Sequence, residues 1–129
     1  MSHGILVLNF SHRLTAEQLE QISDFSGRPV VDAIDVPSHV DLAADLVPQA
    51  CALVDASGIS ALEPGGVPVV VVLPALSVVA ACVLAELHGR LGHFPSIAYL
   101  VRDDGPAVTF RVSGVIPLQG VRDRARQRR

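Results

Sequence analysis

The chain has 129 residues, with ten basic and thirteen acidic side chains and a formal net charge of -3. This length predicts one domain that buries roughly two thirds of its unfolded surface, and the negative charge argues against a long nucleic acid as the partner. Cys51 and Cys82 lie in apolar stretches, and no charged leader opens the chain. We therefore expect a cytoplasmic protein with two buried free thiols.

The first predicted unit is a strand, a polar turn and a helix. Ile5 to Phe10 is a continuous apolar run, which is typical of a strand buried on both faces. Thr15 and Gln18 have the spacing of a capping box, so a helix is predicted over 16–27.

A second strand and a second helix are predicted next. Val30 to Val36 contains two aspartates, which favours a position near a sheet edge. Pro48 is interpreted as the first residue of a helix that ends near Gly58, because the first turn of a helix does not need the N–H that proline lacks. Residues 60–66 are predicted to form a loop.

The nineteen residues from Val67 to Ala85 carry no charge, which is nearly the length of a membrane span. Pro74 within this stretch favours instead a central strand over 69–73, a tight turn and a helix over 77–91. That helix is apolar almost all round, so it needs cover beyond its sheet-facing side. A second copy of the chain is the expected cover, which predicts a homodimer and no membrane partner.

A hairpin and a short helix are predicted to end the chain. Ser96 to Arg102 is expected to form a fourth strand, and the alternation that starts at Val108 a fifth. A helix rich in arginine begins near Gln119. Strands alternating with helices and closed by a hairpin predict a single α/β domain of three layers with a mostly parallel sheet.

Charge is unevenly distributed along the chain. Nine of the thirteen acidic residues lie between Glu17 and Glu63, and five of the ten arginines lie in the last eight residues. Such a tail is either a solvated helix end or a patch for a phosphate-bearing partner.

Two turns are candidates for a ligand site, because ligands of open α/β sheets bind beyond the carboxyl ends of the strands. Both turns lead into helix N-termini, which favour phosphate. Neither contains a glycine-rich phosphate loop, which argues against dinucleotides and nucleoside triphosphate hydrolysis. The candidate ligand contacts are Asn9, Phe10, Ser11 and His12 after the first strand, and Pro74, Ala75 and Ser77 after the third.

Residues 87–95 hold two histidines and an arginine around the end of the third predicted helix. His88 and His93 do not share a helical face, and no CxxC or HExxH motif accompanies them, so we expect no metal and no cofactor. The stretch lies at the amino end of the sheet and is expected to brace the dimer interface. His88 and Arg90 are second candidates for ligand contact, should the dimer carry them to the cleft.

Three segments together resemble one protein family. The first is Leu8-Asn9-Phe10-Ser11-His12 before Leu14-Thr15, and the second is Leu84 to Arg90 with Gly92 to Pro95. The third is Leu118-Gln119 with Val121 to Asp123 and Ala125-Arg126. In them the chain resembles small type III CRISPR-associated accessory proteins of the Csx type, which are grouped with the ring nucleases that bind or degrade cyclic oligoadenylate.

The resemblance implies a Rossmann-like (CARF-like) domain that works as a homodimer, assembles further on its ligand and binds cyclic tetra-adenylate. Sequestration would then lower the free messenger in type III CRISPR defence. A metal-independent ring nuclease that releases linear di-adenylate is one alternative, with His12 and His88 as acid–base candidates. A non-enzymatic protein-interaction module is another. Pro74 and Ala75 offer no polar group to a reacting phosphate, which favours binding over catalysis.

Overall fold

The computed structural model describes residues 4–59 and 66–129. The predicted loop over 60–66 lies outside these residues except for Gly66. The described elements, in chain order, are β1 (Ile5–Asn9), α1 (Ala16–Ser26), β2 (Val30–Asp35), α2 (Leu46–Ala56), β3 (Val69–Val72), α3 (Ser77–Leu91), β4 (Ser96–Arg102), β5 (Phe110–Pro117) and α4 (Leu118–Gln127).

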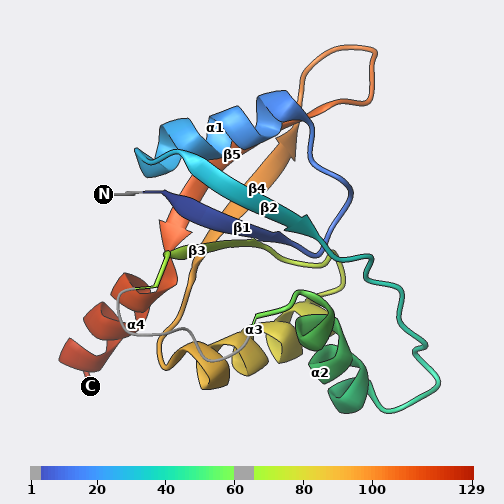
Figure 1. The fold of residues 1–129 in the computed structure, drawn as a ribbon, viewed down its shortest axis with the longest axis vertical. Coiled ribbons are helices and arrows are strands. Elements are labelled where there is room, and N and C mark those ends of the chain that lie inside the picture. Colours follow the sequence, from blue (N-terminus) through green and yellow to red (C-terminus); the bar gives the residue numbers. More distant parts are fainter. Residues whose placement is uncertain (1–3, 60–65) are drawn as a thin grey trace.

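The five strands form one sheet in the order β2-β1-β3-β4-β5. The first four are parallel, and β5 runs antiparallel to β4. α1 covers one face of the sheet, and α2 and α3 cover the other, which gives three layers (Figure 1). The predicted α/β class, the mostly parallel sheet and the closing hairpin are thereby confirmed, and the arrangement is compatible with a Rossmann-like fold. β2 lies at an edge, as its aspartates indicated.

Two apolar clusters join the layers. Leu8 of β1 packs with Leu87 of α3 on one face of the sheet, whereas Val7 packs with Ile22 of α1 on the other. Neighbouring strand residues point to opposite faces, so a central strand covered on both sides must be apolar throughout. This requirement explains the continuous apolar runs of β1 and β3.

The helix ends follow local signals, with one correction. The Thr15 and Gln18 side chains form the predicted capping box, with each accepting from the other's backbone N–H. α2 begins at Leu46 behind an Asp45 cap, so the prediction that Pro48 opens this helix is wrong by two positions. Pro48 fits because no N–H in the first turn has a partner within the helix.

The β4–β5 hairpin has a longer connection than predicted. The Asp103 N–H donates to the Thr109 carbonyl oxygen at 2.9 Å, which closes a loop before the strand resumes. β5 therefore begins at Phe110, and the prediction of a strand from Val108 is wrong. Val108 is 70% exposed in this loop.

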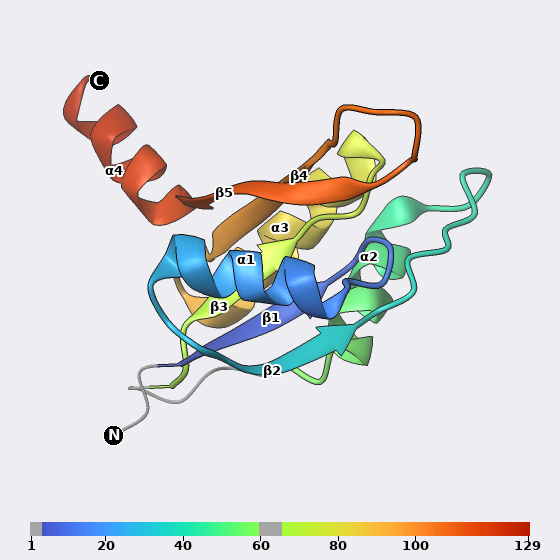
Figure 2. The same cartoon turned by 90° about the horizontal axis from the view of Figure 1, so that it is seen from above.

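Two helical surfaces remain exposed. α4 has no buried residue and projects from the end of β5, away from the rest of the molecule (Figure 2). The outer face of α3 exposes Val78, Ala81 and Ala85. Cys51 and Cys82 are free, as predicted, but half-buried rather than buried.

Candidate functional site

A cavity of about 920 Å³ opens at the carboxyl end of the sheet. Its walls come from the β1–α1 turn, the first turns of α1, the ends of β3 and β4, and the β4–β5 hairpin. The lining residues are Ser11, His12, Arg13, Leu14, Thr15, Glu17, Gln18, Gln21, Val72, Leu73, Ile97, Ala98, Tyr99, Leu100, Asp103, Val108, Thr109, Phe110 and Arg111.

The cavity exists because β3 and β4 diverge. They pair only through Val70 with Ser96 and Val71 with Ile97, while β1 and β3 pair over four positions. Beyond Ile97, β4 turns away from β3 and toward the hairpin loop (Figure 1). The chain also crosses from one side of β1 to the other between β2 and β3. The opening therefore lies at a topological switch point, where ligands of α/β proteins bind.

α1 holds the far wall in place through two glutamine side chains. Gln18 Nε2 donates to the Phe110 carbonyl oxygen at 3.0 Å, and Gln21 Oε1 accepts from the Val112 N–H at 2.8 Å. These bonds occupy the outer edge of β5, beside which no further strand lies among the residues that the structure describes. The cavity is thus bounded by α1 and β5, although ninety residues of sequence separate them.

His12, Arg13 and Glu17 line the cavity where the β1–α1 turn meets α1. His12 is exposed, and the Arg13 side chain is 90% exposed, with Arg13 Nε 4.0 Å from Asp35 Oδ2. Glu17 lies in the first turn of α1. The Arg13 guanidinium is therefore free to meet an anion, since a single long, exposed ion pair holds it only weakly.

A clasp of three side chains closes the hairpin loop. Asp103 Oδ2 accepts from the Thr109 hydroxyl at 2.9 Å, and Asp103 Oδ1 accepts from Arg111 Nη1 at 3.1 Å. The Thr109 hydroxyl, and secondly Arg111, lower the pKa of the Asp103 carboxyl from its ordinary 3.8. The clasp fixes the wall formed by residues 108–111.

We expect this clasp to persist from neutral pH to below pH 3.8. Because folding lowers the pKa of Asp103, its stabilising contribution is present above the unfolded value and disappears as pH falls through the folded value. The amide chemical shifts of residues 103–111, followed by NMR during an acid titration, would report the opening of the clasp. Asp103→Asn should accelerate amide exchange in the loop at neutral pH, and Asp104→Asn should not. Equal exchange in the two variants would contradict the clasp.

The turn after β1 divides the predicted contacts into two kinds. Ser11 and His12 line the cavity. Asn9 and Phe10, by contrast, are 0% and 1% exposed and lie inside the protein. Asn9 Nδ2 donates to the His12 carbonyl oxygen and to Asp35 Oδ1, both at 2.8 Å, and Asn9 Oδ1 accepts from the Ser11 N–H at 3.0 Å. Asn9 thus shapes the turn that presents Ser11 and His12.

The turn after β3 lies beside the cavity rather than in its lining. Pro74 is buried, while Ala75 and Ser77 are exposed. Ser77 is the first residue of α3, whose N-cap position makes no side-chain hydrogen bond. Of this connection, only Leu73 lines the cavity.

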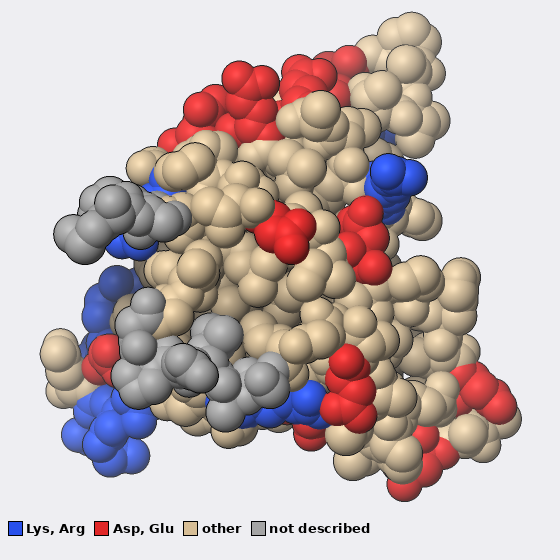
Figure 3. All heavy atoms as spheres, viewed as in Figure 1, with Lys and Arg blue, Asp and Glu red and all other residues tan. Residues whose placement is uncertain are grey.

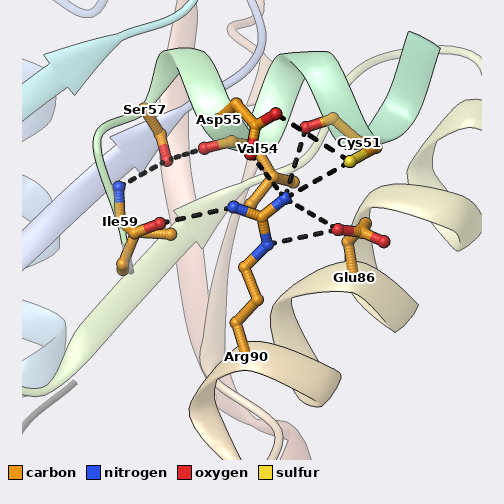
Figure 4. Close-up of polar contacts among 7 residues, drawn as sticks. All are labelled: Cys51, Val54, Asp55, Ser57, Ile59, Glu86 and Arg90. Carbon is orange, nitrogen blue, oxygen red and sulfur yellow. Dashed lines mark hydrogen bonds and ion pairs between the residues drawn. The ribbon is translucent and has the colours of Figure 1, made fainter. Parts of the chain in front are cut away.

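Arg90 lies far from the cavity and joins α3 to α2 (Figure 4). Its Nη2 atom is 2.8 Å from both Glu86 Oε1 and Asp55 Oδ1. The guanidinium also donates to the backbone carbonyl oxygens of Cys51 and Ile59, each at 3.4 Å. The hydrogen bond to Glu86, and then the contact with Asp55, raise the pKa of Arg90 against the opposing effect of desolvation. Through these contacts Arg90 holds α3 against the end of α2.

The neighbouring histidines are also outside the cavity lining. The His88 ring packs on Phe94, with ring centroids 4.2 Å apart, and His93 is exposed. The Phe94 N–H donates to Gln119 Oε1 at 2.9 Å, which connects this segment to α4. In one chain, residues 88–93 and the cavity therefore lie at opposite ends of the sheet.

Searches for other kinds of site give three findings. Within residues 4–59 and 66–129, no three or more metal-binding side chains lie close enough to hold an ion. Over the same residues, no helix is both long and apolar enough to cross a membrane. Comparisons with protein-family models, curated proteins and solved structures find no match.

Proposed function

We propose that this protein binds cyclic tetra-adenylate in the cavity at the carboxyl end of its sheet and sequesters it during type III CRISPR defence. The observation that carries the proposal is the place of the first of the three segments that resemble the Csx-type proteins. Ser11 and His12 of this segment, with Arg13 beside them, line a cavity at the switch point of a mostly parallel sheet.

The cavity offers the two kinds of contact that an adenylate needs. Arg13, His12 and the Ser11 hydroxyl can donate hydrogen bonds to a phosphate, and Arg111 can do so if a phosphate displaces Asp103. Leu100, Phe110 and the other apolar side chains of the wall provide a surface for a base. Mostly apolar walls with a few placed polar groups are typical of small-molecule sites.

A homodimer suits this ligand. A ring of four identical nucleotides has two-fold symmetry, and two copies related by a two-fold axis present the same contacts twice. The exposed outer face of α3, with Val78 47% exposed, is the surface we propose for this pairing. A CARF-like dimer that assembles further on its ligand belongs to the same proposal.

Binding is proposed without cleavage as the main activity. Opening the ring requires a ribose 2′-OH aligned with the adjacent phosphorus and stabilisation of the charge that develops there. Among the predicted acid–base residues, His12 alone lines the cavity, whereas His88 packs on Phe94. Glu17, Tyr99 and Asp103 also line the cavity, but Asp103 is held by Thr109 and Arg111, so this set favours a slow enzyme at most.

Calorimetry with purified protein tests the proposal. Cyclic tetra-adenylate should bind, and His12→Ala or Arg13→Ala should weaken the affinity by about tenfold or more, because each removes a hydrogen bond to a charged group worth about 1.5–3 kcal/mol. His93→Ala, which changes an exposed histidine away from the cavity, is the matched control.

The absence of heat with cyclic tri-, tetra- and hexa-adenylate would overturn the proposal and favour a protein-interaction module. Chromatography of the mixture after long incubation separates the two nucleotide activities. An intact ring indicates sequestration, and linear di-adenylate indicates a ring nuclease.

A further inference from the structure

The chain divides into an acidic body and a basic arm. Residues 1–117 hold five arginines and twelve acidic residues, for a net charge of -7, while residues 118–129 hold five arginines and one aspartate, for a net charge of +4. Figure 3 shows acidic side chains along α1 at the top and arginines around α4 at the lower left. In this view the acidic region of α1 lies above the sheet and the basic region of α4 lies below it (Figures 1 and 3).

The basic arm, α4, is attached to the body near its first turn, where Gln119 accepts from the Phe94 N–H, and most of the rest of the helix is exposed. None of its residues is buried, and the Arg122 contact with Asp123, at 2.8 Å, is its one ion pair among the residues described. Leu118, Val121 and Ala125 form an apolar stripe with arginines on both sides. A helix of ten residues is marginal in water without a packed face. α4 therefore has both the charge and the exposed apolar surface of a docking element.

The outer face of α1 is the complementary surface. Glu20 and Asp24 are exposed and share this face with Glu17, which is exposed and also lines the edge of the cavity. None of the three forms an ion pair with any residue that the structure describes. Three unpaired carboxylates on one helix repel one another, so cations alongside them lower the electrostatic energy.

The spacing of the two charged stripes matches. Glu20 and Asp24 are four residues apart on α1, and Arg122 and Arg126 are four residues apart on α4. Each pair spans about one helical turn, or about 6 Å. Two antiparallel helices would thus bring Arg126 beside Glu20 and Arg122 beside Asp24. We infer that α4 of one copy docks on the acidic face of α1 of a second copy.

A second copy fits these observations better than a nucleic acid does. A polyanion that approached α4 would meet the field of a body with a net charge of -7. The apolar stripe of α4 would also lack a partner along a phosphate backbone. A second copy offers carboxylates at the matching spacing. It is also always present, at the concentration of the protein itself. The inference is independent of the proposed ligand.

Sedimentation velocity of the full chain at two salt concentrations tests the inference. The wild-type protein should show an associated species at about 50 mM salt that is lost at about 500 mM, because surface ion pairs are screened. Arg122→Glu with Arg126→Glu, and separately Glu20→Arg with Asp24→Arg, should each abolish the salt-sensitive species. An equimolar mixture of the two double variants should restore it, since the reversed α4 then meets a reversed α1.

The control is Arg28→Glu with Arg102→Glu, which makes the same charge change on exposed arginines outside α4. It should retain the salt-sensitive species, whereas its loss would indicate a bulk charge effect and overturn the inference. So would an unchanged wild-type mass at both salt concentrations, or a mixture that fails to associate. Binding of a single-stranded oligonucleotide that needs Arg122 and Arg126, with no self-association, would assign α4 to nucleic acid instead.

Discussion

Arg90→Ala is expected to lower the free energy of unfolding by about 2–3 kcal/mol and to leave the affinity for cyclic tetra-adenylate unchanged. The Arg90 side chain is 22% exposed and joins α3 to α2 through Asp55 and the Cys51 carbonyl oxygen. It also contacts Glu86 of its own helix and the Ile59 carbonyl oxygen beyond α2. Its removal leaves the carbonyl oxygens of Cys51 and Ile59 without these donors. Asp55 is 64% exposed, so solvent already weakens its ion pair and the loss stays moderate.

Urea denaturation of three variants would measure this effect. Arg90→Lys keeps the charge but cannot direct donors at four acceptors in one plane, so its loss should lie between those of wild type and Arg90→Ala. Arg102→Ala, at an exposed position at the end of β4, should have little effect. Weaker ligand binding in Arg90→Ala, with stability intact, would mean that Arg90 contacts the ligand.

The element boundaries that the sequence predicted best are those with a local signal. Gly92 ends α3 with φ at 81°, a conformation that glycine adopts at little cost. α1 has its capping box at one end and Gly27 at the other. At these positions nearby residues determine where the helix begins or ends, so one sequence is enough to predict the boundary. The predicted start of α2 at Pro48 is wrong because proline is tolerated throughout the first helical turn and does not mark its first residue.

The far wall of the cavity could not be predicted in this way. Asp103, Arg111 and Phe110 reach the β1–α1 turn only because β3 and β4 stop pairing after Ile97. That divergence depends on the register of strands and on the two bonds from Gln18 and Gln21 to β5. No local motif encodes a contact across ninety residues. The sequence thus indicated which strand end carries the site, and tertiary structure supplied the opposite wall.

A polar residue that contacts a ligand cannot be distinguished, from the sequence alone, from one that shapes the turn. Asn9 and His12 are both polar, and they lie at the end of the same buried strand and just beyond it. The strand ends with backbone groups that need partners inside the protein, and a short amide side chain can supply them. Asn9 fills that role, while His12 is left exposed.

Asn9→Ala is therefore expected to lower the free energy of unfolding by about 3 kcal/mol, because three half-buried hydrogen bonds are lost at about 1 kcal/mol each. The same change frees the Ser11 N–H and the His12 carbonyl, so the turn loosens and ligand affinity should also fall. Urea denaturation and calorimetry on one preparation would measure both effects. Full stability in Asn9→Ala would contradict this role.

Asn9→Asp separates the hydrogen bonds of this side chain from its shape. The new carboxylate would lie against Asp35, whose Oδ1 atom is 2.8 Å from Asn9 Nδ2 in the wild-type chain. Burial and the neighbouring charge should raise the pKa of the new carboxyl in the folded state. Its stability relative to wild type should therefore be greatest in acid and fall as pH rises through that raised value. Urea denaturation of the variant and wild type at about pH 5 and about pH 8 should show this loss. If the stability difference between them did not depend on pH, residue 9 and Asp35 would have to lie further apart than in the structure.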